Sequence, residues 1–310
     1  MEEIYDVMIL GAGAAGLTAG IYSSRAKLKT IILNEGAIGG QMVLTNEIAN
    51  YPGVELTKGY SLAATMKKQA KDFGCKIKSN VKIANLQLKE TIKTVELEDG
   101  RSFQAKSVII APGGKPRSLD IEGEEKFKGT GISFCATCDG EFFTDKEVIV
   151  VGGGNSALEE AVSLSKYATK ITIVHQFDHF QAFEHAIRDA KNNEKISFIL
   201  ESELRGFYGT DGLEKVSIEH LPTGKIAEMK TDGVFIFAGY QPNTQAFEQI
   251  IKLNDRKEIL VDEDMKTNIA GVFAAGDCIA KKYRQVTTAV ADGTIAGLSA
   301  ANYIQNFKNQ

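Results

Sequence analysis

The sequence lacks the features that would point to a membrane, a secretory route or a nucleic acid. No uninterrupted apolar stretch approaches the roughly 20 residues that a helix needs to cross a bilayer. The N-terminus, MEEIYDVMIL, has neither the basic flank nor the small-residue cleavage site of a secretory signal. The net charge is only -4, from 36 basic and 40 acidic residues, so no strong field attracts polyanions. We therefore expect no membrane partner, no nucleic-acid partner and a cytoplasmic location.

Cysteine is also scarce, with four residues at positions 75, 135, 138 and 278. A reducing cytosol disfavours structural disulfides, so the close pair Cys135 and Cys138 is predicted to be catalytic or metal-binding. A zinc knuckle needs four nitrogen or sulfur ligands, and Cys75 and Cys278 stand alone in the sequence. We therefore expect no metal site, and we expect the two isolated cysteines to be buried thiols that pack as small hydrophobic side chains.

The N-terminal residues have the pattern of a dinucleotide-binding fold. The apolar run 4–10 predicts a buried parallel strand, and the glycine motif 11–16, GAGAAG, follows it at once. A helix through Arg25 comes next, as such a motif requires. A second apolar strand, 30–33, ends at Asn34 and Glu35, where an acidic side chain would meet the ribose hydroxyls of an adenosine.

A second copy of this pattern lies in the middle of the chain. The strand 147–151 leads into the glycines 152–154, and the tail from 272 onward then returns to features of the first fold, with a strand that ends in Gly276 and Asp277. Because 310 residues exceed the size of one typical core, two domains are expected. We predict an α/β protein with two Rossmann-like nucleotide-binding domains, the second inserted into the first. The predicted boundaries are 1–114 and 244–310 for the first domain and 115–243 for the second.

Together these motifs resemble the low-molecular-weight thioredoxin reductases over nearly the whole chain. The most specific match is CATCDG at 135–140, placed just before the second glycine motif, and GGQ at 39–41, NYPG at 50–53 and RQV at 284–286 agree with it. The resemblance implies FAD in the outer domain, a homodimer, and thioredoxin as electron acceptor. It also implies that Cys138 faces the flavin, that Cys135 attacks the disulfide of thioredoxin, and that Asp139 donates and accepts protons.

The chemistry agrees with these roles, because a thiolate must attack one sulfur and a second thiol must resolve the mixed disulfide. An adjacent carboxyl group can move the protons if a partly buried site raises its pKa. Most of the predicted FAD contacts lie in the glycine motif, in the GGQ and NYPG motifs, at the ends of predicted strands or at the start of the last helix. They are Gly11, Gly13, Ala14, Ala15, Gly16, Asn34, Glu35, Gly40, Gln41, Asn50, Val81, Ala111, Gly113, Gly276, Asp277, Arg284, Gln285 and Val286.

The chain departs from the family where NADPH-using members carry His-Arg-Arg-x-x-x-Arg to hold the 2′-phosphate. Here the segment 175–181 reads HQFDHFQ, without arginine. Charged hydrogen bonds contribute on the order of 1.5–3 kcal/mol each, so losing three should weaken NADPH binding more than about a thousandfold. The strand before it also lacks the terminal acid that would hold the free ribose of NADH. Asn155 and Ala291 are two smaller departures.

The sequence therefore resembles a branch that lacks nicotinamide motifs and takes electrons from reduced ferredoxin. As a hypothesis, Lys281, Lys282 and Arg284 offer a basic docking patch for an acidic ferredoxin, the alternative being a solvated run of charges. Three other functions stay open. They are a nicotinamide-dependent reductase with an atypical site, an FAD-dependent oxidase of small dithiols, and a non-catalytic flavin-binding sensor. The oxidase usually has histidine in place of Asp139, which argues against it.

Overall fold

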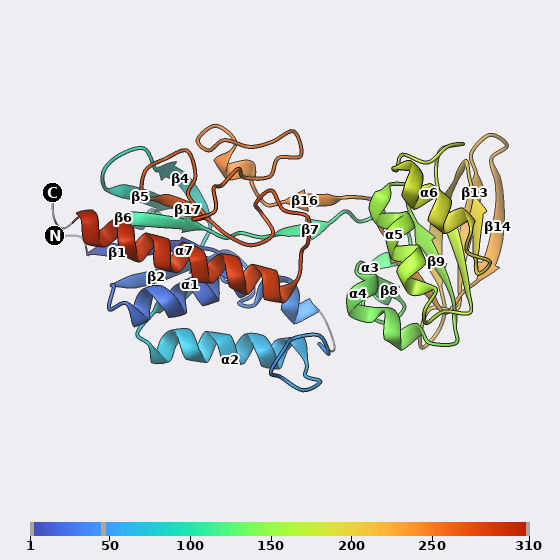
Figure 1. Cartoon of the computed structure of the whole chain (residues 1–310), viewed down its shortest axis with the longest axis horizontal. Coiled ribbons are helices and arrows are strands. Elements are labelled where there is room, and N and C mark those ends of the chain that lie inside the picture. Colours follow the sequence, from blue (N-terminus) through green and yellow to red (C-terminus); the bar gives the residue numbers. More distant parts are fainter. Residues whose placement is uncertain (1–2, 45–47, 308–310) are drawn as a thin grey trace. The chain divides into compact units, whose positions relative to one another are not determined.

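The structure, a computed structural model, describes residues 3–44 and 48–307, and the chain forms two compact units (Figure 1). Unit 1 consists of Met1–Lys115 and Gln241–Gln310, and unit 2 consists of Pro116–Tyr240. The chain passes between the units at β7 (Gly114–Pro116) and β16 (Tyr240–Pro242), which pair as a two-stranded sheet. Among the described residues, no helix combines the length and apolar character needed to cross a membrane.

Unit 1 is built on a seven-stranded sheet in the order β3-β2-β1-β6-β5-β4, with β17 paired to β6. The parallel strands are β1 (Ile4–Leu10), β2 (Thr30–Asn34), β3 (Lys76–Ser79), β6 (Ser102–Ile110) and β17 (Val272–Ala274). The strands β4 (Ile83–Gln87) and β5 (Lys93–Leu97) are antiparallel additions at one edge. The helices are α1 (Ala14–Arg25), α2 (Gly59–Asp72) and α7 (Val286–Phe307), with short 3-10 turns η1 (Gly40–Leu44) and η3 (Gln245–Phe247).

The central strand β1 is apolar without alternation from Val7 to Leu10, because both faces of the sheet are covered there. Val7 and Ile9 pack in one buried cluster with Leu17 of α1 and several alanines of α7. Met8 and Leu10 pack in a second cluster on the opposite face, with residues of the C-terminal segment around 247–279. Side chains of a strand alternate between faces, so this distribution requires a layer on each side of the sheet.

The helices α1 and α7 lie against one another along one face of the sheet (Figure 1). Their backbones approach closely because α7 carries glycine at the contact. A Cβ atom on Gly293 would lie 2.2 Å from the carbonyl oxygen of Ala15, and one on Gly297 would lie 3.1 Å from that of Ala19. The first distance is shorter than any van der Waals contact, so only glycine fits at position 293.

Unit 2 has a five-stranded parallel sheet in the order β11-β10-β9-β15-β8. The strands are β8 (Ile132–Ser133), β9 (Glu147–Val151), β10 (Lys170–Val174), β11 (Ile196–Ile199) and β15 (Gly233–Ile236). Its helices are α3 (Glu124–Phe127), α4 (Ala136–Asp139), α5 (Asn155–Leu164) and α6 (Glu184–Lys191), with the 3-10 turn η2 (Gly140–Phe143). A second, antiparallel sheet contains β12 (Ser202–Tyr208), β13 (Lys215–His220) and β14 (Lys225–Lys230).

The two faces of the unit 2 sheet pack against different layers. Val150 of β9 shares a buried cluster with Leu158 of α5, whereas its neighbour Ile149 shares one with Leu204 and Val216 of the antiparallel sheet. In each unit, a strand of the parallel sheet leads through a glycine motif into a helix. The strand and helix are β1 and α1 in unit 1, and β9 and α5 in unit 2. The predicted α/β fold class, with two Rossmann-like units and the second inserted into the first, is confirmed.

Candidate redox and cofactor site

The two cysteines of the CATCDG motif belong to the single helical turn α4, which follows the edge strand β8. Cys135 precedes the first residue of this turn, and Cys138 lies within it. They form a disulfide, with their Cα atoms 5.3 Å apart. Cys135 is the N-cap of α4, and its Sγ accepts a hydrogen bond from the backbone N–H of Cys138 at 3.2 Å. Both residues are partly exposed. The turn therefore presents a dithiol/disulfide pair at the surface of unit 2.

Asp139 ends the same turn and is held by a serine of the preceding strand. Ser133 Oγ donates a 2.6 Å hydrogen bond to Asp139 Oδ2, and it accepts the N–H of Cys135 at 3.1 Å. Burial raises the pKa of Asp139, and the hydrogen bond from Ser133 opposes that rise. A carboxyl group with a raised pKa can hold a proton next to the cysteines. The sequence interpretation did not include Ser133, although its place two residues before the first cysteine was a signal.

The other two cysteines are buried and unreactive. Cys75 and Cys278 are free thiols in the core of unit 1, and burial raises the pKa of each to about 12. The thiolate is the reactive form, and it is negligible at neutral pH with such a pKa. The expectation that both are packed thiols is confirmed. Among the described residues, no group of three or more His, Cys, Asp or Glu side chains is arranged to hold a metal ion.

The first glycine motif joins β1 to α1, and its three glycines differ in their surroundings. A Cβ on Gly11 would lie 2.1 Å from the carbonyl oxygen of Ala111, and one on Gly16 would lie 2.0 Å from that of Gly11. A Cβ on Gly13 would meet nothing within 4 Å. Two glycines therefore allow close packing of strand and helix, and the third leaves open space beside the N-terminus of α1. The N-cap residue of α1 is Gly13, which has no side chain to cap the first N–H groups, and this suits a pyrophosphate.

Asn34 and Glu35, the residues predicted to contact FAD at the end of β2, differ in burial and in hydrogen bonding. Asn34 is buried, and its Oδ1 accepts the N–H of Ala12 at 2.8 Å, while its Nδ2 donates to the Gly36 carbonyl at 2.5 Å. Its amide is thus used to shape the glycine loop. Glu35 is exposed. Val81 lies beside this loop, with its N–H bonded to the carbonyl of Asn34 and its side chain in the core.

Asp277 follows β17, and one of its oxygens is a buried acceptor for which the described residues provide no hydrogen-bond donor. Its Oδ1 is inaccessible, and the nearest cation is Lys281 Nζ at 4.0 Å. Burial raises the pKa of Asp277, opposed by the charges of Lys281 and Arg284. Asp292 of α7 fixes the surrounding turn, because its Oδ2 accepts both the N–H of Gly276 at 3.1 Å and Lys281 Nζ at 2.5 Å. An orphaned acceptor of this kind fits a hydroxyl-rich chain such as the ribitol of FAD.

The remaining predicted FAD contacts lie near these residues or on the surface next to them. A Cβ on Gly40 would lie 3.2 Å from Gly13 Cα, and one on Gly276 would lie 2.8 Å from Ala15 Cβ. Asn50 Nδ2 lies 3.3 Å from Gln285 Oε1, which brings two segments far apart in the sequence together. The others are Ala14 and Ala111, which are buried, Gly113 and Val286, which are partly exposed, and Gln41, which is exposed. The ends of β1, β2, β6 and β17 thus converge, as expected at the carboxyl edge of a parallel sheet.

The hypothesis of a basic docking patch at 281–284 is wrong for two of its three residues. Lys281 is only 12% exposed and pairs with Asp292, which is 13% exposed. Arg284 forms an ion pair with Glu258, which is almost fully buried. Only Lys282 has an exposed charge. Two of the three cations thus form ion pairs within unit 1. Their carboxylate partners lie elsewhere in the sequence, so the residues 281–284 alone do not reveal these pairs.

The second glycine motif is crossed by the segment that follows β10. The N–H of Gln181 donates to the carbonyl of Gly153 at 2.8 Å, and the N–H of Phe183 donates to Asn155 Oδ1 at 2.7 Å. The His175 ring lies on Gly153, where a Cβ would be 2.3 Å from its Nε2. Burial lowers the pKa of His175, which favours the uncharged imidazole.

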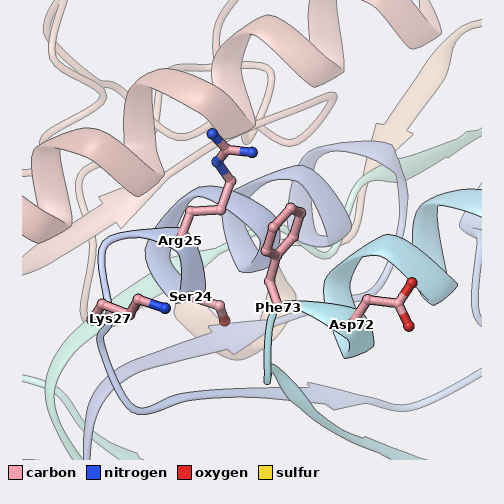
Figure 2. A pocket seen from close by; sticks show the side chains of 5 residues that line it. All are labelled: Ser24, Arg25, Lys27, Asp72 and Phe73. Carbon is pink, nitrogen blue, oxygen red and sulfur yellow. The ribbon is translucent and has the colours of Figure 1, made fainter.

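A small pocket lies elsewhere in unit 1, between the C-terminal ends of α1 and α2 (Figure 2). It has a volume of about 320 Å³ and is lined by Ser24, Arg25, Lys27, Asp72 and Phe73. Figure 2 shows the Arg25 guanidinium beside the Phe73 ring, and the two are 5.0 Å apart. None of these residues belongs to the glycine motifs or the redox turn, so the pocket is separate from the predicted chemistry.

Comparisons with known proteins agree with this geometry. The model of the pyridine nucleotide-disulphide oxidoreductase family matches residues 5–293. A thioredoxin reductase of Peptoclostridium acidaminophilum is 44% identical, covering 99% of this chain and 100% of its own length. The 34.2 kDa protein in the rubredoxin operon of Clostridium pasteurianum is also 44% identical, covering 98% of each chain.

A solved structure extends the likeness to three dimensions. The crystal structure of thioredoxin reductase from Streptococcus pyogenes MGAS5005 matches with a TM-score of 0.93 and 39% identity, over 99% of this chain and 100% of that one. FAD is the cofactor of this family, and the open glycine loop and the orphaned carboxylate of unit 1 fit it. The chain therefore belongs to the pyridine nucleotide-disulphide oxidoreductase family and, within it, to the thioredoxin reductases.

Proposed function

We propose that the protein reduces the disulfide of thioredoxin through the Cys135–Cys138 pair, and that reduced ferredoxin rather than NADPH supplies the electrons. When bound in unit 1, FAD would supply the two electrons that reduce the Cys135–Cys138 disulfide to the dithiol. The relatives named as thioredoxin reductases support the acceptor, and the disulfide at the surface of unit 2 supports the route.

In this proposal Cys135 and Cys138 act in sequence on the substrate. The Cys135 thiolate attacks one substrate sulfur, the substrate S–S bond breaks, and the departing sulfur takes a proton. The Cys138 thiolate then attacks Cys135 Sγ, which releases the substrate as a dithiol and restores the internal disulfide. Two electrons and two protons reach the substrate in total. Asp139 is the proton donor and acceptor, because burial raises the pKa of its carboxyl group and so favours the protonated form beside the cysteines.

The FAD contacts belong to the same proposal. The N–H groups at the start of α1, beside Gly13, would hold the pyrophosphate. Glu35 would meet the adenosine ribose, and Asp277 would accept a hydrogen bond from the ribitol chain. The homodimer and the cytoplasmic location stay predictions, and analytical ultracentrifugation of the holoprotein tests the first.

The proposal that NADPH is not the electron donor rests on the charge of the segment beside the second glycine motif. Where family members that use NADPH hold its 2′-phosphate, the exposed side chains here are Gln176, Phe177, Asp178 and His179, and none of them is an arginine or a lysine. The hydrogen bond from His179 lowers the pKa of Asp178, so its carboxylate is negative at neutral pH. His175 is buried, which lowers its pKa and favours the uncharged imidazole. A negative charge in place of three guanidinium groups repels a phosphate rather than binding it.

Anaerobic reduction of the purified flavoprotein tests the donor. We expect reduced ferredoxin to bleach the flavin band, and NADPH and NADH at physiological concentrations to leave it unchanged. Bleaching by NADPH would overturn the donor assignment and leave the disulfide chemistry intact. The same preparation, supplied with ferredoxin and thioredoxin, should form thioredoxin dithiol. If no donor supports this reaction while small dithiols drive oxygen consumption, the protein is a dithiol oxidase instead.

A further inference from the structure

One largely buried lysine lies between two aspartates beside the proposed FAD site. Lys281 Nζ is 2.5 Å from Asp292 Oδ2 and 4.0 Å from Asp277 Oδ1. The side chain of Asp277 is 25% exposed, whereas those of Lys281 and Asp292 are 12% and 13% exposed. The lysine is therefore bonded to the more buried aspartate, and the more accessible one is left without this cation as a direct partner.

The backbone next to Asp277 holds Asp292 in place. Asp292 lies in α7, and its Oδ2 also accepts the N–H of Gly276 at 3.1 Å. Gly276 has a φ of +83°, and a Cβ there would lie 2.8 Å from Ala15 Cβ in α1. The turn that carries Asp277 is thus held between α7 and α1. Asp292 contacts both this turn and Lys281 with one oxygen.

We propose that Asp292 is a positioning residue of the FAD site, because its pairing with Lys281 keeps this cation from closing on Asp277. This role rests on the proposed function, in which Asp277 accepts a hydrogen bond from the ribitol chain. Closing the 4.0 Å gap would turn the Asp277 carboxylate toward Lys281 and give its Oδ1 a partner. The acceptor offered to FAD would then be occupied or misdirected.

The charges of these three side chains decide which ion pair forms. Asparagine at position 292 keeps an acceptor oxygen for the N–H of Gly276 but removes the negative charge. Asp277 then carries the only negative charge of the three. The ammonium group of Lys281 should move toward it, because opposite charges 4.0 Å apart attract strongly in a partly buried place. This contact does not restore the stability of the native pair, since the turn must distort to form it.

Three variants of the holoprotein separate this charge effect from a general effect on the fold. Asp292→Asn removes the carboxylate, and the double variant Asp292→Asn/Lys281→Met also removes the ammonium group. Asp72→Asn is the matched control, because Asp72 pairs with Lys68 at the same 2.5 Å on the exposed surface of α2. Each holoprotein is diluted without free FAD, and the released flavin is measured by its fluorescence at equilibrium. Neither thioredoxin nor an electron donor is present.

We expect Asp292→Asn to lower the affinity for FAD about tenfold or more, the usual effect of losing a hydrogen bond to a charged group. The double variant should return to within about threefold of the native affinity, because replacing both partners of a buried ion pair is often nearly neutral. Asp72→Asn should match the native protein. Native affinity in Asp292→Asn would overturn the proposal. A double variant as weak as Asp292→Asn would also overturn it, because Asp292 would then act only through the fold.

The double variant also covers the case in which Asp292→Asn retains too little FAD to measure. A flavin content near the native level in the double variant then supports the proposal, and a content as low as that of Asp292→Asn overturns it. If the native protein itself takes up no FAD, the proposed function fails. If the native protein binds FAD and Asp292→Asn binds it equally well, only this inference fails.

Discussion

Ser133 Oγ lies 2.6 Å from Asp139 Oδ2, so the strand that leads into the redox turn also holds the acid that ends it. The same hydroxyl oxygen accepts the N–H of Cys135. One side chain thereby links the first cysteine to the carboxyl group proposed as its proton partner. The arrangement makes Asp139 sensitive to changes at a residue outside the CATCDG motif.

Replacing Ser133 by alanine should move the pH dependence of thioredoxin reduction to higher pH. The hydrogen bond from Ser133 lowers the pKa of Asp139, so its loss leaves the rise caused by burial unopposed. A higher pKa keeps the carboxyl group protonated to higher pH, and the alkaline limb of the rate should follow it. The measurement is the rate of the half-reaction between dithiol enzyme and thioredoxin from pH 5 to 9. A profile identical to that of the native protein would exclude this coupling.

Asp139→Asn should slow the same half-reaction about a hundredfold, because general acid–base catalysis typically contributes two to four orders of magnitude. The substitution keeps the size of the side chain and its contact with Ser133. FAD content and the disulfide between Cys135 and Cys138 should be unaffected. Stopped-flow measurement of thioredoxin reduction gives the rate, and an unchanged rate would remove Asp139 from the mechanism.

Serine at position 135 or 138 should lower thioredoxin reduction more than about a thousandfold, since an oxygen cannot form or resolve the mixed disulfide. Cys75→Ala is the control. Its thiol is buried, with a pKa raised to about 12, and takes no part in the chemistry. The control should keep native turnover with a modest loss of thermal stability. If Cys138→Ser retained turnover, the resolving step would be assigned wrongly.

Asp292→Asn should destabilise unit 1 by about 3 kcal/mol, because it leaves the ammonium group of Lys281 without its carboxylate in a largely buried place. The exposed pair Lys68–Asp72 has the same 2.5 Å separation, with side chains 76% and 56% exposed. Asp72→Asn should therefore change the free energy of unfolding by less than about 1 kcal/mol. Urea unfolding of both variants measures the difference, and equal effects would show that burial does not matter here.

Gly293→Ala should lower both thermal stability and FAD content, and Gly297→Ala should change neither by much. The added methyl group at 293 would lie 2.2 Å from a backbone oxygen of α1, whereas that at 297 would lie at 3.1 Å. Overpacking of this kind costs about 1–3 kcal/mol. Helix propensity favours alanine by about 1 kcal/mol at both sites and offsets the milder clash. Thermal melting followed by flavin fluorescence distinguishes the two, and a native melting curve for Gly293→Ala would contradict the close packing.

The sequence was sufficient to predict the parts of the fold that follow local rules. The run into Gly11 and the glycines after β9 carry the strand–glycine–helix pattern, and Asp277 is the first charged residue after β17. The antiparallel sheet β12–β14 was not predicted. Its edge strand β14 is almost entirely exposed, so it has no apolar pattern to recognise. Hydrogen bonds to β13 position this strand. The pattern of residues within β14 alone does not reveal which strand it pairs with.

The side chains around the site were predictable only where a motif names them. Cys135, Cys138 and Asp139 lie in one motif. Asn50 and Gln285 are 235 positions apart in the sequence, yet their side chains form a hydrogen bond. The basic docking patch was predicted wrongly because a tertiary contact was missed: Lys281 pairs with Asp292, which lies in α7. Contacts of this kind arise from tertiary packing, which periodicity and spacing do not encode.

The insertion of unit 2 between two parts of unit 1 sets the order in which the protein can assemble on the ribosome. All of Pro116–Tyr240 is synthesised before β17 and α7 leave the exit tunnel. The redox turn can therefore reach its final packing while the flavin-binding sheet still lacks a strand, and Asp277 is added only after all of unit 2. A nascent chain stopped after residue 240 should hold its disulfide turn but retain no flavin.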